Sequence, residues 1–203
     1  MFNLIKKDII IQKTQLLLFV PLIIFLVFFA YNLSPILIFL LASTFIPANA
    51  YVYDSLTESN MLLNSLPYTR KEIVASRYIG AVVYMVISIA LAGVVLYLTD
   101  FGFGIEDMAI AAGLFFTFAA FAFPLFYILK PAYIGIAIFI GMIVLAIGFQ
   151  PASRFLAKHL TTITDFIASL STTTLYLSSA AIALGLYLIS WLASQWIYQR
   201  KVF

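Results

Sequence analysis

The stretch NSLPYTRKEIVASRY, residues 64–78, places a proline, two arginines, a lysine and a glutamate between two long apolar runs. Pro67 disfavours a helical conformation at the residue before it, because its ring clashes with that residue's backbone. Thr69 and Glu72 follow with the spacing of a capping box, in which two side chains satisfy the first backbone N–H groups of a helix. The stretch therefore predicts a break around 66–68 and a new helix that starts at Thr69.

The residues just before this break, DSLTESNMLLNSL at 54–66, carry a second capping signal. Ser55 and Glu58 repeat the capping-box spacing, so we expect a short helix from about 56 to 65. Its apolar face would consist of Leu56, Leu63 and Leu66, with Met61 and Leu62 beside it. Two capped helices in one loop indicate that the loop has a rigid shape. The alternative is that the segment forms an interfacial helix that merely reverses the chain.

The composition identifies the surroundings of the rest of the chain. Of the 203 residues, 65% are hydrophobic and 9% are charged, whereas a soluble domain has roughly 25% charged residues. A water-soluble fold of this length could not bury so much apolar surface, so a lipid bilayer must form part of its surroundings. The net charge of +3 is small, which gives a nucleic-acid partner little support.

Charged residues divide the chain into apolar segments of about 20 residues, the length of a membrane-spanning helix. The segment 14–53 is long enough for two spans joined by a hairpin at 32–35, and single spans are expected at 78–99, 108–129, 131–153 and 175–198. We therefore predict an all-α integral membrane fold with six transmembrane helices in a single transmembrane domain, 1–203. An even number of spans puts both termini on one side.

The distribution of Lys and Arg predicts the orientation, because cytoplasmic loops of membrane proteins are enriched in these residues. If both termini are cytoplasmic, the residues inside are Lys6, Lys7, Lys13, Arg70, Lys71, Arg77, Lys130, Arg200 and Lys201. Those outside are then Arg154 and Lys158. Aromatic residues near the predicted span ends fit the interfacial belts of membrane proteins; they include Tyr78, Tyr97, Tyr127, Trp196 and Tyr198.

Other segments show apolar or small-residue periodicity. Residues 1–14 predict an interfacial helix that leads into the first span, with an ordinary basic flank as the alternative. Residues 150–173 predict extracytoplasmic amphipathic helices at the outer leaflet. In the fifth span, close to one helix face, lie Gly135, Gly141 and Gly148. Small residues in this pattern favour a helix–helix contact, although glycine is also simply tolerated in spans.

The predicted spans contain no Asp, Glu, Lys, Arg or His residue. Ion-coupled transport and intramembrane proteolysis usually need such groups within the bilayer. The chain also lacks the G-x-x-x-x-G-K-[ST] sequence of a phosphate-binding loop. We therefore expect no catalytic residue, cofactor site or metal site in this chain, and any energy for work would come from a partner.

The sequence LLNSLPYTRKEIVASRYIG, residues 62–80, resembles the LPxSRKEIVxSKY pattern of ABC-2-type transporter permeases, the membrane subunits of a family of bacterial ATP-driven exporters. Thr69 stands where serine is common, and Arg77 stands where lysine is common. The six-span layout, the cytoplasmic termini and the amphipathic outer loop also resemble this family. In size and pattern the chain is similar to permeases of peptide-antibiotic immunity exporters and of phenol-soluble-modulin exporters.

The resemblance implies that the cytoplasmic loop 54–77 contains a coupling helix between spans 2 and 3, which docks on a separate ATPase subunit. ATP and magnesium would bind to that subunit, and two permease copies, identical or different, would assemble with two ATPases. The implied coupling residues are Asp54, Ser55, Leu56, Glu58, Met61, Leu62, Leu63, Leu66, Thr69, Arg70, Lys71 and Glu72.

From these observations we expect the membrane-spanning subunit of an ABC exporter in the cell membrane. Its cargo would be an amphipathic or antimicrobial peptide or a hydrophobic compound, because the predicted spans carry no charge. The polar candidates to line an uncharged path are Thr44, Asn49, Ser88 and Thr117. The alternative is a membrane partner of an ATPase that acts in sensing or peptide resistance without translocation.

Overall fold

The computed structural model describes residues 21, 23–25, 34–56, 69–129, 133, 136, 140–141, 154–155, 158 and 171–200. Within these residues the fold is all-helical, as predicted. Its long helices are α2 (Pro35–Leu56), α4 (Arg70–Leu98), α5 (Ile105–Ile128) and α8 (Thr172–Arg200). In the described part of the chain, α4, α5 and α8 are long and apolar enough to cross a membrane by length and composition.

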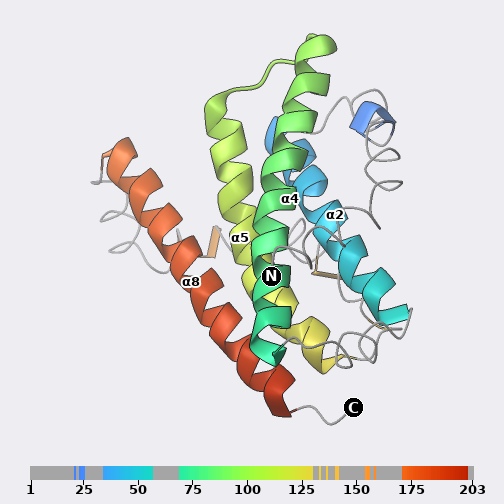
Figure 1. Cartoon of the computed structure of the whole chain (residues 1–203). Helices are drawn as coiled ribbons and strands as arrows, with labels where there is room; N and C mark the ends of the chain where they lie inside the picture. Colours follow the sequence, from blue (N-terminus) through green and yellow to red (C-terminus); the bar gives the residue numbers. More distant parts are fainter. Residues whose placement is uncertain are drawn as a thin grey trace.

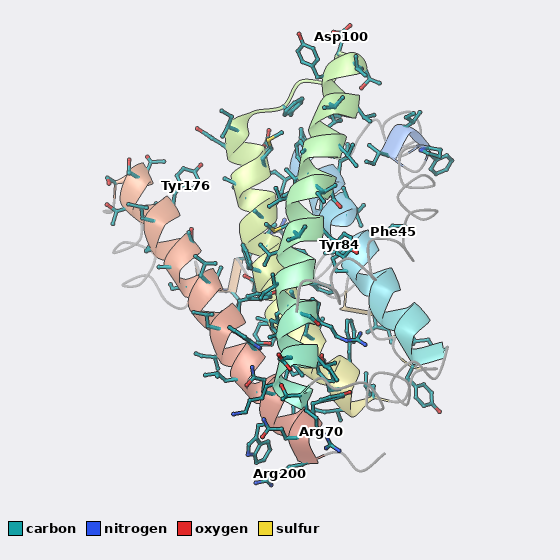
Figure 2. The ribbon with its side chains drawn as sticks, viewed as in Figure 1. Phe45, Arg70, Tyr84, Asp100, Tyr176 and Arg200 are labelled. Atoms are coloured by element: carbon teal, nitrogen blue, oxygen red, sulfur yellow. The ribbon has the colours of Figure 1, made fainter. Side chains whose placement is uncertain are left out.

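The helices form a bundle in which α4 runs opposite to α2, α5 and α8 (Figure 1). α4 packs against α2 and α8, and α5 packs against the same two helices. Figure 2 shows Arg70 and Arg200 at one end of the bundle, with Asp100 and Tyr176 toward the other. These relative directions agree with those expected for spans 2, 3, 4 and 6, while the number of spans and their orientation in the membrane stay predictions.

A tight turn ends α4 and directs the chain back along the bundle. The Phe101 N–H donates to the Leu96 carbonyl at 3.0 Å, and the Asp100 N–H donates to the Tyr97 carbonyl at 3.3 Å, as in a Schellman motif. Asp100 has a φ of 52°, in the left-handed region that short polar side chains tolerate. Phe101 packs against the buried cluster that contains Leu96, so an apolar contact reinforces the turn.

Two buried clusters hold the bundle together. The first joins α4, α5 and α8 through aromatic residues that include Tyr78, Phe123, Tyr187 and Tyr198. The second lies toward the end of α4 and joins it to α2 and α5, through residues that include Phe39, Ala92, Leu96 and Ala111. α8 therefore meets α4 near the start of α4, and the two helices diverge toward the other end (Figure 1).

Three predicted spans agree with observed helices to within a few residues, apart from two extra turns at the start of α4. The segment 78–99 corresponds to the later part of α4, 108–129 to α5 and 175–198 to α8. α4 starts before its predicted span because the Thr69–Glu72 capping box begins it there. α5 starts before its predicted span where the Asp107 carboxylate accepts a hydrogen bond from the Gly104 N–H at 2.8 Å.

Several predicted segments fall wholly or largely outside the described residues. Residues 1–14 are outside them, and the first and fifth spans are described at isolated positions. Within the predicted outer loop 150–173, Arg154, Phe155 and Lys158 are helical and exposed, and α8 begins at Thr172. The interfacial helix and the amphipathic outer helices therefore stay predictions.

The predicted helix start at Ser55 is wrong, because residues 54–56 form the last turn of α2. An N-cap residue has a non-helical backbone, whereas Ser55 is helical. No glycine or proline lies between Pro47 and Pro67, so no helix-breaking residue ends α2 at the predicted membrane boundary. The rest of the predicted coupling helix, residues 57–65, lies outside the described residues.

Thiol labelling tests the predicted orientation, and the chain has no cysteine to interfere. We expect a cysteine at Asp107 or at Lys158 to react with a membrane-impermeant maleimide in intact cells, because the Lys and Arg distribution places both positions outside. A cysteine at Glu58 should react only after the membrane has been opened. The reverse labelling pattern would contradict the orientation.

Candidate functional site

The start of α4 has the predicted capping box. Thr69 has an extended backbone, with φ −72° and ψ 149°, and its hydroxyl oxygen accepts a hydrogen bond from the Glu72 N–H at 3.3 Å. The Glu72 carboxylate accepts from the Thr69 N–H at 2.8 Å and from the Thr69 hydroxyl at 2.9 Å. The predicted helix start is therefore confirmed, and it fixes the point where the predicted loop becomes α4.

Hydrogen bonding keeps the Glu72 side chain ionised. The Thr69 backbone N–H, and then the Thr69 hydroxyl, stabilise the carboxylate and lower the pKa of Glu72 below its ordinary value. Because the folded-state pKa is lowered, the cap contributes stability above the ordinary carboxyl range. It loses that stability as the pH falls through the lowered value. The start of α4 is therefore insensitive to pH changes around neutrality.

Arg70 follows the cap and reaches across to the end of α8. Its Nη1 donates hydrogen bonds to the main-chain carbonyl oxygens of Gln199 at 2.9 Å and Tyr198 at 3.4 Å. In the last turn of a helix the helix itself supplies no N–H partner for the carbonyls, and a cation there also meets the negative end of the helix dipole. The side chain ties the first turn of α4 to the last turn of α8.

Two turns further along α4, the Tyr78 hydroxyl forms hydrogen bonds inside the bundle. Its oxygen lies 2.8 Å from Ser190 Oγ and 2.7 Å from Ser194 Oγ, both on α8. The Tyr187 hydroxyl donates to the Tyr78 main-chain carbonyl at 2.9 Å. All four residues are at most 7% exposed. The three α8 residues are spaced three and four apart, so they share one helix face.

Aromatic rings enclose these hydroxyl groups. The centroid of the Tyr78 ring lies 5.0 Å from that of Phe123 in an edge-to-face pair, and 5.0 Å and 6.3 Å from those of Tyr187 and Trp191. Such ring pairs add to the stability of a packed core. The group therefore joins α4, α5 and α8 by both ring packing and directed hydrogen bonds.

Sequence reasoning missed this group, because it assigned Tyr78 and Tyr198 to an interfacial belt. Both side chains are 2% exposed, whereas Tyr97 at 75% and Trp196 at 58% are exposed as belt residues would be. The signal that could have revealed the group is the recurrence of polar and aromatic residues on one face of α8, at Tyr187, Ser190, Ser194 and Tyr198.

The predicted coupling residues that the structure describes lie at one end of the bundle. The end of α2, with Asp54, Ser55 and Leu56, and the start of α4 both lie there (Figure 1). At the start of α4, Thr69, Arg70 and Glu72 form the cap and the link to α8, and Lys71 is exposed. The residues outside the described part are Glu58, Met61, Leu62, Leu63 and Leu66.

The predicted path residues lie on three different helices. Thr44 of α2 is buried and Thr117 of α5 is half-buried, and each hydroxyl donates to a main-chain carbonyl one turn earlier at 2.9 Å. Ser88 of α4 is fully buried, and its hydroxyl has no hydrogen-bond partner among the described residues. Asn49 belongs to α2, and its side chain lies outside what the structure describes. A path lined by these residues stays a prediction.

Gly141 is the one of the three predicted contact glycines that the structure describes. A methyl group in place of its hydrogen would lie 3.6 Å from the Phe118 ring of α5, an ordinary van der Waals distance. Gly141 therefore lies beside α5. Gly135 and Gly148 are outside the described residues, so a contact formed by all three glycines stays a prediction.

One protein-family model matches nearly the whole chain. The family model described as ABC-2 family transporter protein matches residues 3–199. This range includes the residues between α2 and α4 and extends almost to the end of α8. No curated protein and no solved structure matches the chain.

Proposed function

This chain belongs to the ABC-2 family of transporter proteins, and on that premise we propose that it serves as the permease of an ATP-driven exporter of amphipathic peptides or hydrophobic compounds. The family match and the long apolar helices identify a multi-pass membrane protein. Permeases of this family generally pair with an ATPase subunit. ATP and magnesium would therefore act in that partner, and this chain would supply the membrane path.

The observation that carries the proposal is the family match over residues 3–199, which includes the membrane helices and the loop that connects α2 to α4. The geometry of the bundle supports the coupling role of this loop. The end of α2 and the start of α4 lie at the same end of the bundle (Figure 1). An ATPase bound to the loop would therefore act on two helices at once.

The length of α4 supports transmission of movement across the membrane. Its 29 residues correspond to about 43 Å at a rise of about 1.5 Å per residue, which exceeds the hydrocarbon core of about 30 Å. No proline interrupts the helix, and the Thr69–Glu72 cap fixes its start. A displacement at the loop would therefore reach the Asp100 end of the bundle.

The cargo proposal rests on the absence of charge within the helices. There is no Asp, Glu, Lys, Arg or His in the helical segments 78–98, 108–128 and 175–198. A hydrophilic ion would need a charged or strongly polar partner within the bilayer. An amphipathic peptide or a hydrophobic compound can instead contact uncharged aromatic and aliphatic side chains.

We expect a synthetic amphipathic helical peptide to raise the ATPase rate of the reconstituted complex severalfold, because such a peptide can enter an uncharged membrane path. A scrambled peptide of the same composition, without an apolar face, is the matched control. Sodium, potassium and chloride ions should leave the basal rate unchanged. Stimulation by the ions with the amphipathic peptide inert would contradict the cargo proposal.

A transport assay distinguishes the exporter from the alternative function. In that alternative the chain is a partner of an ATPase in sensing or peptide resistance and does not translocate cargo. An exporter should accumulate a fluorescent amphipathic peptide inside inverted membrane vesicles when ATP is present. A partner that does not translocate would bind the ATPase and respond to peptide without accumulating it. ATPase stimulation together with peptide accumulation would favour the exporter.

A further inference from the structure

The contacts between the start of α4 and the end of α8 form one region, which we call the α4–α8 contact. Its members are Arg70 and Tyr78 on α4, with Tyr187, Ser190, Ser194 and the carbonyls of Tyr198 and Gln199 on α8. We propose that Tyr78 is a positioning residue for transport, which holds α8 to α4 so that a displacement of α4 is passed to α8. This inference rests on the proposed function, in which an ATPase acts on the loop before α4.

The position of the contact suits this role. It lies at the end of the bundle where the loop enters α4, and α8 diverges from α4 beyond it (Figure 1). The described buried residues of α8 lie between Ala183 and Tyr198, whereas Leu177 and Ile182 nearer its start are exposed. A movement of α4 would therefore act on α8 through the contact near the second half of α8.

α8 is joined to α4 by buried hydrogen bonds at Tyr78, and to α5 by ring pairs and an exposed hydrogen bond. α8 meets α5 through ring pairs such as Phe116–Tyr187 at 5.1 Å and Tyr127–Tyr198 at 5.3 Å. An exposed contact of 3.5 Å also joins the Tyr176 hydroxyl to the Glu106 carboxylate. The bonds from α8 to Tyr78 are shorter and buried. α8 contacts α5 more extensively than it contacts α4, and the buried hydrogen bonds to Tyr78 add a directed constraint on its position along α4.

The Tyr78 hydroxyl fixes the register between the two helices. It lies between two serine hydroxyls that are one helical turn apart on α8. A shift of α8 along α4 would separate these groups in a buried site, where polar groups without partners are disfavoured. α8 can therefore follow α4 at lower cost than it can slide past it.

Arg70 supplies a second point of attachment. It lies eight residues before Tyr78, which corresponds to about 12 Å along α4. Two attachments at this separation resist rotation of α8 about either one, as well as sliding. The capping box at Thr69 and Glu72 keeps the intervening helix intact up to its first residue. The start of α4 and the end of α8 are thus expected to move together.

The test follows ATP-driven movement on each helix in the complex purified with its ATPase. A single cysteine reporter replaces Tyr97 on α4 or Leu177 on α8, both of them exposed. We expect the thiol-labelling rate of each reporter to change between the nucleotide-free and the ATP-plus-vanadate states. Tyr78→Phe keeps the ring and removes the hydroxyl. In this variant the α4 reporter should keep its response, and the α8 reporter should lose part of its response, because the Tyr187 and Arg70 hydrogen bonds remain.

Two further variants separate this role from a purely structural one. Ser190→Ala combined with Ser194→Ala should reproduce the loss at the α8 reporter, and adding Tyr78→Phe should cause no further loss, because the changes remove the same hydrogen bonds. Tyr84→Phe is the matched control, since Tyr84 is buried on α4 in the cluster shared with α2. It should leave the responses of both reporters unchanged.

Each outcome decides the proposal. An equal loss at both reporters, or an unchanged α8 response in Tyr78→Phe, would overturn the positioning role. If neither reporter responds in the unmodified complex, the proposed function fails. The contact is then tested on the permease alone, with spin labels at Ile79 and Leu192. The distribution of distances between the labels should broaden in Tyr78→Phe, and an unchanged distribution would overturn the α4–α8 contact as a positioning element.

Discussion

Replacing Leu63 by Glu should abolish transport and reduce co-purification of the ATPase, with a normal amount of permease in the membrane. Leu63 belongs to the apolar face predicted for the loop before Pro67 and lies outside the described residues. A carboxylate within an apolar contact loses water without gaining a partner. A penalty of about 3 kcal/mol would weaken binding roughly 100-fold. The membrane helices are untouched, so insertion should be normal.

Asn64→Glu is the matched control, because it adds the same charge at the neighbouring residue, about 100° away around a helix. Its ATPase yield should stay close to that of the unmodified permease. If Leu63→Glu permease disappears from the membrane, Leu63 packs against the protein's own helices. If the ATPase co-purifies with it at normal yield and transport continues, the loop is not the coupling element.

Phe123→Ala should produce a large loss of stability in the bundle. Phe123 is 2% exposed, and its ring centroid lies 5.0 Å from that of Tyr78, 6.1 Å from Phe126 and 6.3 Å from Tyr187. Phe→Ala costs about 3–5 kcal/mol in soluble cores. Lipid is as apolar as the core, so packing and cavity terms remain within a bilayer. We therefore expect a loss of about 3 kcal/mol, the lower end of that range.

Unfolding of the purified permease in mixed detergent micelles measures this loss. Phe121→Ala removes the same ring from an exposed position on the same helix, where the side chain is 65% exposed. Its effect should stay within about 0.5 kcal/mol. Equal losses for the two variants would show that the cluster around Phe123 is not the core of the bundle.

The start of α4 and the extent of α4, α5 and α8 could be predicted because the deciding interactions are local. Thr69 and Glu72 are three residues apart, and their side chains reach each other as soon as the helix turns. The same local reasoning failed at Ser55, although its spacing to Glu58 is identical. There α2 extends through the predicted capping residue, and no proline lies between Pro47 and Ser55, whereas Pro67 lies two residues before Thr69.

The contacts around Tyr78 could not be predicted in this way. Its partners Ser190 and Ser194 lie 112 and 116 residues further along the chain, and periodicity within one helix says nothing about its neighbour. A hydroxyl in a membrane helix can also bond to its own backbone, as those of Thr44 and Thr117 do. Which choice a serine makes depends on the helix that packs against it.

The most direct test of whether this chain is a permease driven by a separate ATPase is native mass spectrometry. The complex is isolated through a tag on this chain. We predict a particle with two permease copies and two ATPase subunits, from which Leu63→Glu removes the ATPase subunits. Isolation of the permease without any ATP-hydrolysing subunit, in a detergent that preserves other membrane complexes, would contradict the proposal.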